Sequence, residues 1–180
     1  MRFKPTHFSG AYLIEPTPHR DARGIFARTF CTEEFAEQGL ETSFPQHSLS
    51  VSTLAGTLRG IHFQRPPHTE IKVVRCIAGV IFDVIVDLRP HSPTYGLWQG
   101  FELSAANGHQ VYVPEGFAHG HQTLTDEASI FYLISKPFAP GSAAGIRYDD
   151  PRLAIRWPHP VTAIGDADQA WPHLDEVNLA

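Results

Sequence analysis

The chain has 180 residues and a formal net charge of -5, with 42% hydrophobic and 18% charged residues, which is ordinary globular composition. This length predicts one domain over residues 1–180, and the negative charge excludes a general attraction to nucleic acid or to anionic membranes. No apolar run has the length of a membrane span or the character of a signal peptide, so we expect a soluble, cytoplasmic protein.

Most of the predicted elements are short strands. In the N-terminal part, "GIFARTF" (24–30) alternates as a strand does, and "TEEFAEQGL" (32–40) is predicted to be a short helix capped by Thr32 and ended by Gly39. From about 46 to 135 strand follows strand with turn residues between, as in "KVVRCIAGVIFDVIVDLR" (72–89), which breaks at Ala78-Gly79. Residues 136–180 are rich in Pro, Gly and Asp, with one helical turn near the end. This order predicts an all-β antiparallel sandwich or barrel.

One motif specifies the architecture further. Residues 108–119 read "GHQVYVPEGFAH", which is Gly, five residues, Pro, one residue, Gly, two residues and His. This spacing resembles the second motif of the cupin superfamily, although Thr123 replaces its usual final Asn. Pro114 and Gly116 suit a tight turn between strands, after which His119 points into the barrel. We therefore expect a cupin-type jelly-roll β-sandwich with a few short helices.

The first cupin motif is only partly present. Gly56, five residues and His62 fit it, but Gln64 stands where the second metal-binding His belongs, and Glu70 follows at a longer interval. Because Gln is a poor ligand for a transition metal, we expect no metal. A metal-dependent oxygenase or isomerase that uses His62, Glu70 and His119 remains an alternative.

Six segments together resemble the dTDP-4-dehydrorhamnose 3,5-epimerase family, a metal-free branch of the cupins. They are "DARGIFARTF", "GTLRGIHFQRPPHTEIKVVRCIAG", "FDVIVDLRPHSPTYGLW", "LSAANGHQVYVPEGFAHG", "GIRYDDPRLAIRWP" and "DADQAWP", and they run from Asp21 to Pro172. The resemblance implies a homodimer that inverts C3 and C5 of a nucleoside-diphosphate 4-keto-6-deoxyhexose without a cofactor. The expected reaction converts dTDP-4-dehydro-6-deoxy-D-glucose to dTDP-4-dehydro-L-rhamnose.

The resemblance also implies four catalytic residues, and their chemistry suits an epimerase. His62 is the expected base, with Asp168 as its carboxylate partner, although Asp166 is a close rival. Lys72 is expected near the C4 oxygen, where a cation stabilises the enolate. Tyr132 is the expected acid, which returns a proton to the opposite face. Asp83 is either a buried structural carboxylate or a second support for His62.

A second group is expected to hold the substrate. Arginine offers a bidentate fork for a diphosphate, and an aromatic ring can stack on a nucleobase. The residues implied by the resemblance are Arg23, Gln46, Arg59, His119 and Phe138. Arg28 and Ser48 are expected in the same shell, but Glu and Asn are usual at these positions in the family. Ala143, Ala167 and Glu70 also replace the usual residues, Glu, Lys and Gln.

These departures leave several questions open. The reacting groups match the family while the nucleotide-binding shell differs, so the nucleobase, the sugar and the inverted carbons remain undetermined. A C3-only epimerase, or an epimerase of another nucleotide sugar, could keep the same base and acid. A non-catalytic carbohydrate-binding jelly roll is the third alternative, but such a protein has no need of an acid and a base.

Overall fold

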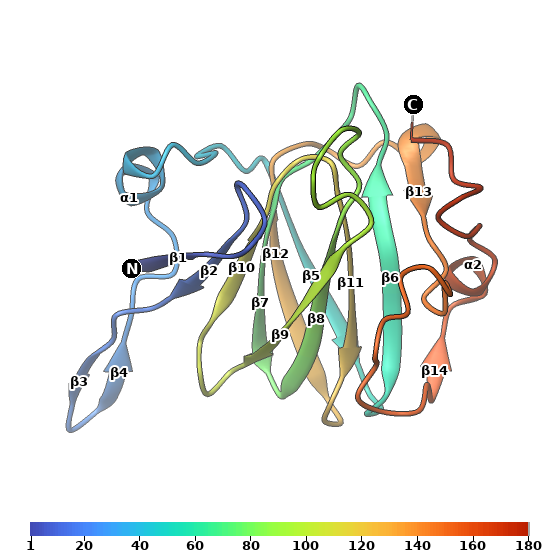
Figure 1. The fold of residues 1–180 in the computed structure, drawn as a ribbon. Helices are drawn as coiled ribbons and strands as arrows, with labels where there is room; N and C mark the ends of the chain where they lie inside the picture. Colours follow the sequence, from blue (N-terminus) through green and yellow to red (C-terminus); the bar gives the residue numbers. More distant parts are fainter. Residues whose placement is uncertain (180) are drawn as a thin grey trace.

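The computed structural model describes residues 1–179, which form two facing β-sheets (Figure 1). The first sheet has the order β1-β2-β10-β7-β12-β5, and the second has the order β13-β6-β11-β8-β9 with β14 added beside β6. All neighbours in these sheets pair antiparallel except β14, which runs parallel to β6. The expected all-β sandwich is therefore confirmed.

The strands of the first sheet are β1 (Arg2–Pro5), β2 (Tyr12–Glu15), β5 (Gln46–Ser52), β7 (Lys72–Ala78), β10 (Gln110–Val113) and β12 (Ala128–Ile134). Those of the second are β6 (Thr57–Gln64), β8 (Val80–Asp87), β9 (Trp98–Ser104), β11 (Phe117–Thr123), β13 (Ala143–Gly145) and β14 (Ala163–Ile164). A separate hairpin joins β3 (His19–Asp21) to β4 (Gly24–Phe26), and the short helices are α1 (Thr32–Glu37), α2 (Asp166–Gln169) and a 3-10 turn at Pro140–Ser142.

Two N-terminal predictions need correction. The expected strand over 24–30 ends at Phe26, because within residues 1–179 it pairs with β3 alone, and Pro18 just before β3 has no N–H to continue the pairing. The N-cap of the expected helix is Cys31 rather than Thr32, and the Cys31 carbonyl accepts the N–H of Phe35 at 3.0 Å. The helix ends at Glu37 with Gln38 as its C-cap, and Gly39 follows with a φ of +68°, so Gly39 ends the helix as expected.

The hydrophobic core has layers on both sides of each sheet. Strand β8 shows why: Ile81 and Ile85 pack in the cluster between the sheets, whereas Val84 and Val86 face the opposite way. A strand covered on both faces is apolar at every position, and only Asp83 and Asp87 break this rule in β8. The outer cluster is completed by residues of the C-terminal segment such as Leu174, which covers the second sheet.

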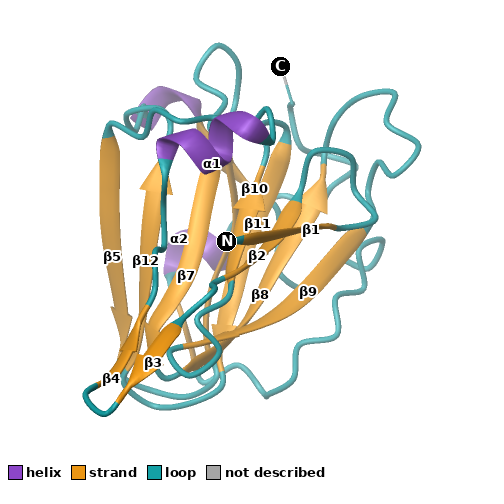
Figure 2. Ribbon diagram, turned by 90° about the vertical axis from the view of Figure 1, so that its left-hand side faces the viewer, coloured by secondary structure: helices purple, strands orange, loops and turns teal. Residues whose placement is uncertain are grey.

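The outer face of the first sheet is covered at one end only. Figure 2 looks onto this sheet, with α1 across one end and the β3–β4 hairpin at the other. Phe35 of α1 is fully buried against Val73 and Leu133. Farther along the same face, Leu49, Val51 and Ile77 are exposed.

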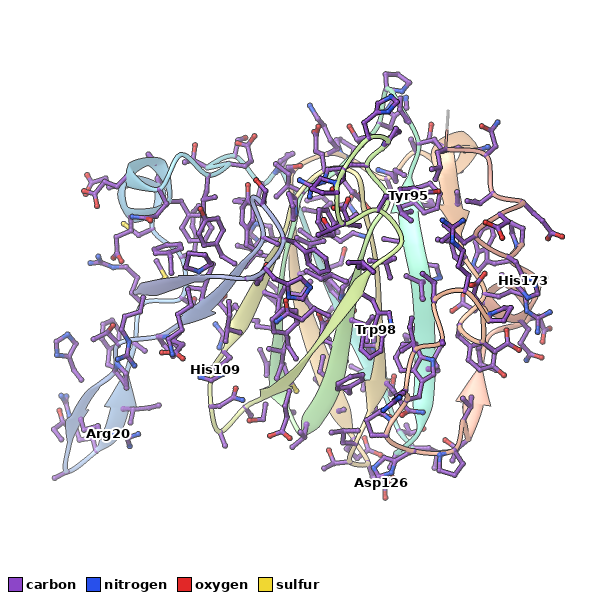
Figure 3. The ribbon with its side chains drawn as sticks, in the orientation of Figure 1. Arg20, Tyr95, Trp98, His109, Asp126 and His173 are labelled. Carbon is purple, nitrogen blue, oxygen red and sulfur yellow. The ribbon has the colours of Figure 1, made fainter. Side chains whose placement is uncertain are left out.

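The β3–β4 hairpin projects from the body of the molecule (Figures 1 and 3), and Figure 3 shows Arg20 on it, well away from the two sheets. The side chains of Ile25 and Phe26 on this hairpin are 59% and 77% exposed. No helix within residues 1–179 is long and apolar enough to cross a membrane.

Candidate active site

Part of the space between the sheets is polar rather than hydrophobic, and it forms a cavity of about 400 Å³. This volume lies within the range of small-molecule sites, about 300–1,000 Å³. Strands β5, β7 and β12 supply one wall, β6 and β11 supply the other, and α2 closes one side. The lining residues are Ser48, Ser50, Arg59, His62, Lys72, His119, His121, Tyr132, Ile134 and Asp168.

His62 and Asp168 form a hydrogen-bonded pair at this cavity. His62 Nε2 lies 2.6 Å from Asp168 Oδ1, while Asp168 Oδ2 accepts the backbone N–H of Gly60 at 3.0 Å. The indole N–H of Trp171 also donates to Oδ1, at 3.2 Å. Burial alone would raise the pKa of Asp168, but the hydrogen bond and charge of His62, with these two donors, hold the pKa below its ordinary value. Within residues 1–179 the hydrogen bond of His62 is made by Nε2, so Nδ1 is available to a ligand.

Tyr132 projects from β12 into the same cavity. Its hydroxyl lies 3.5 Å from Nδ1 of His121, and its ring meets the ring of His119 edge-on at 6.1 Å between centroids. Burial, helped by the negative charge of Asp83, raises the pKa of Tyr132 above its ordinary value. The hydroxyl is therefore a protonated group at neutral pH, as an acid must be.

His119 and His121 lie side by side on β11. His119 Nε2 is hydrogen-bonded to Asp83 Oδ2 at 2.7 Å, and both side chains are buried. Asp83 is thus a buried carboxylate whose partner is His119, whereas the carboxylate partner of His62 is Asp168. Burial lowers the pKa of His121 to about 3, so that its imidazole is neutral.

Two cations face the cavity with different partners. The guanidinium of Arg59 donates to Ser52 Oγ at 3.3 Å and to the carbonyl of Val51 at 3.2 Å. Lys72 Nζ lies 2.8 Å from Glu70 Oε1 in a largely buried ion pair. Arg59 therefore has no carboxylate among these partners, whereas Lys72 has one.

The remaining substrate-shell residues fall into two groups. Gln46 and Phe138 lie together, since Gln46 Oε1 accepts the N–H of Phe138 at 2.9 Å, and Phe138 is 60% exposed. Arg23 lies on the projecting hairpin, with its side chain 91% exposed and paired with Asp21. Arg28 is paired with Glu34 at 2.8 Å. Within one chain, neither Arg23 nor Arg28 lines the cavity.

The residues of the metal alternative do not converge. Glu70 is turned toward Lys72 and Gln64, and His119 is bound to Asp83. Nowhere in residues 1–179 do three or more His, Cys, Asp or Glu side chains form a group that could hold a metal ion.

Sequence reasoning overlooked four contributors to this site. His121, Ser50 and Ile134 line the cavity, and Trp171 holds Asp168. The signal for the first three was strand alternation, because each follows an expected residue by two positions on its strand: His119, Ser48 and Tyr132. No such pattern pointed to Trp171, because the segment around it is irregular.

The fold and the cavity define a cupin-like β-sandwich with a histidine–carboxylate pair, a buried tyrosine and two cations around one small-molecule site. The family described as dTDP-4-dehydrorhamnose 3,5-epimerase matches residues 5–176, and the chain belongs to this family.

Individual relatives agree with this assignment. The chain is 44% identical to the dTDP-4-dehydrorhamnose 3,5-epimerase of Methanothermobacter thermautotrophicus, over 98% of this chain and 96% of the relative. It is 40% identical to a dTDP-4-dehydrorhamnose 3-epimerase of Streptomyces niveus, over 94% of this chain and 82% of the relative. The chain also matches a solved structure of dTDP-6-deoxy-D-glucose-3,5-epimerase from Legionella pneumophila in complex with dTDP-4-keto-L-rhamnose. The TM-score is 0.93 and the identity is 36%, over 98% of this chain and 94% of that structure's chain.

Proposed function

We propose that the protein epimerises C3, C5 or both in a nucleoside-diphosphate 4-keto-6-deoxyhexose. The most direct candidate reaction converts dTDP-4-dehydro-6-deoxy-D-glucose to dTDP-4-dehydro-L-rhamnose. The observation that carries this proposal is one cavity lined by His62 with its partner Asp168, by the protonated Tyr132 and by the cation of Lys72.

Each of these groups has a role in the proposed reaction. His62 removes the proton from the carbon beside the C4 ketone, and Asp168 stabilises the imidazolium that forms. Lys72 stabilises the negative charge that develops on the C4 oxygen. Tyr132 then protonates the carbon from the opposite face, which inverts it. The proposed steps are proton transfers with no net oxidation, so they require no nicotinamide, and the Lys72 cation supplies the positive charge at the C4 oxygen.

The rest of the cavity suits the activated sugar. Arg59 and His119 are proposed to hold the diphosphate and the sugar, with Ser48 and Gln46 as polar neighbours. Phe138, exposed beside Gln46, is proposed to lie against the nucleobase.

We further propose that the protein acts as a homodimer. Arg23 belongs to the expected substrate shell, yet it lies on a hairpin that projects away from the cavity of its own chain. The exposed Ile25 and Phe26 on this hairpin, and the exposed Leu49 and Val51 on the first sheet, are apolar surfaces that a second copy would cover. In such a dimer the hairpin brings Arg23 to the partner's cavity. Location in the cytoplasm remains a prediction.

Solvent deuterium exchange tests the proposed reaction. Incubation with dTDP-4-keto-6-deoxyglucose in deuterated buffer should introduce deuterium at C3 or C5, as read by NMR. His62→Ala should abolish the exchange, whereas His159→Ala, which removes an exposed histidine on a loop, should not change it. Absence of exchange with the thymidine substrate and with other nucleotide forms would show that the protein is not this kind of epimerase.

A C3-only epimerase is the second candidate. The observation that favours it is the 40% identity to the Streptomyces niveus 3-epimerase, close to the 44% identity to a 3,5-epimerase. The same NMR experiment separates the two, because a C3-only enzyme leaves the C5 proton in place after prolonged incubation.

A further inference from the structure

The ammonium group of Lys72 is held by a carboxylate that stands behind the cavity. Lys72 is the first residue of β7, and its side chain lines the cavity while Glu70, just before the strand, does not. Only 13% of the Lys72 side chain and 10% of the Glu70 side chain are exposed, and the ion pair measures 2.8 Å. An ammonium has three N–H donors, so Lys72 can stay paired with Glu70 and still donate to a ligand.

Glu70 is itself held by Gln64, the last residue of β6. Gln64 Nε2 donates to Glu70 Oε2 at 2.9 Å and to the carbonyl of His68 at 3.1 Å. Gln64 Oε1 accepts the backbone N–H of Ala139 at 2.7 Å. Because both ends of this buried amide are engaged, its orientation is determined, and its N–H group binds Glu70 Oε2 while Oε1 of the same carboxylate faces Lys72.

These contacts form a continuous network from the reaction centre to the loop that carries Phe138. The network runs from Lys72 through Glu70 and Gln64 to Ala139, and the neighbouring Phe138 is bound in turn by Gln46. Both residues in the middle occupy positions that a metal-binding cupin uses for metal ligands, and here they bind each other.

We propose that Glu70, oriented by Gln64, is a positioning residue that directs the Lys72 ammonium toward the C4 oxygen of the sugar. A free lysine side chain is flexible and would also be attracted to the diphosphate. The carboxylate holds Lys72 in one place and offsets its attraction to the phosphates, leaving them to Arg59. This proposal rests on the proposed function and assigns a role to a residue that does not touch the substrate.

Glu70→Leu tests the proposal, because it fills a similar volume and removes the contacts of the carboxylate with Lys72 and Gln64. Glu70→Gln is less decisive, because Gln is the usual residue of the family at this position. For Glu70→Leu we expect kcat for deuterium exchange to fall by about 10- to 100-fold, as for a displaced catalytic group, while the Kd for dTDP changes less than about twofold. The matched control is Glu102→Leu, which replaces an exposed glutamate on β9 and should leave both values unchanged.

A double-mutant comparison shows whether Glu70 acts through Lys72. If it does, Lys72→Met and the combined Lys72→Met/Glu70→Leu variant should have the same residual kcat, because the two losses do not multiply. Glu70→Asp, which keeps the charge but shortens its reach, should give an intermediate loss and serves if Glu70→Leu does not fold.

Two results would overturn the proposal. One is a kcat within about twofold of wild type in Glu70→Leu or Glu70→Asp, and the other is a multiplicative loss in the combined variant. Both leave the proposed function intact provided that the wild-type protein exchanges deuterium and His62→Ala does not. Absence of exchange in the wild-type protein would instead refute the proposed function itself.

Discussion

Replacing Asp168 with Asn should slow the reaction without unfolding the protein. The substitution removes the charge that is hydrogen-bonded to His62 Nε2 at 2.6 Å. It also places an NH₂ group where an oxygen now accepts, and both oxygens accept N–H groups, one from Trp171 and one from Gly60. Whichever way the new amide is oriented, one donor faces another donor.

The size of the effect follows from the geometry. The Asp168 side chain is only 13% exposed, so water replaces little of what is lost. A hydrogen bond to a charged group contributes about 1.5–3 kcal/mol, and each 1.4 kcal/mol is tenfold in rate, which predicts a roughly 10- to 150-fold decrease in kcat. The loss should appear in kcat rather than in dTDP affinity, because Asp168 supports the imidazolium that forms during the reaction.

The assay is deuterium exchange at C3 and C5 followed by NMR, with thermal unfolding of each variant measured in parallel. Asp166→Asn is the matched control, because Asp166 lies two residues away on the same helical turn and is exposed. The reasoning is refuted if Asp168→Asn retains more than half of the wild-type rate, or if both variants lose the same activity.

The hydrogen-bonded pair of His62 and Asp168 also predicts how the stability of the folded protein depends on pH. The pKa of Asp168 in the folded chain lies below its ordinary value of 3.8, so its stabilising contribution is complete above about pH 4. That contribution is lost as the pH falls through the folded-state pKa, and Asp168→Asn should therefore show a weaker loss of stability in acid. Thermal unfolding between about pH 2 and 6 measures this difference.

Three further substitutions test separate parts of the site. Tyr132→Phe should reduce inversion more than exchange, because proton removal by His62 does not need the hydroxyl, and NMR reads both. His121→Phe should lower kcat by up to about tenfold, the value of one modest hydrogen bond. It should not move the pH profile at neutral pH, since the pKa of His121 is about 3; a shifted profile would contradict this. Arg23→Ala should raise KM and the Kd for dTDP while leaving the melting temperature unchanged, and unaltered affinity would remove Arg23 from the site.

Some parts of the site could be predicted from the sequence because the rules behind them are local. Strands cover few residues between turns, so the two apolar runs on either side of Gly79 predicted β7 and β8, and Gly79 itself has a φ of +73°. The Pro-x-Gly turn placed His119 on the following strand. The family resemblance named His62, Lys72 and Tyr132, whose positions share one cavity.

Other features depend on segments far apart in the chain, and only the tertiary structure decided them. The choice of Asp168 over Asp166 depends on the C-terminal segment packing beside β6, 106 residues away from it in sequence. The separation of Arg23 from the cavity depends on the direction in which the β3–β4 hairpin projects. The residues of the hairpin do not specify this direction by themselves. The role of Glu70 depends on Gln64 and Lys72 converging from two different sheets. Local residue patterns specify which way a side chain faces, whereas its partner is set by the packing of the whole chain.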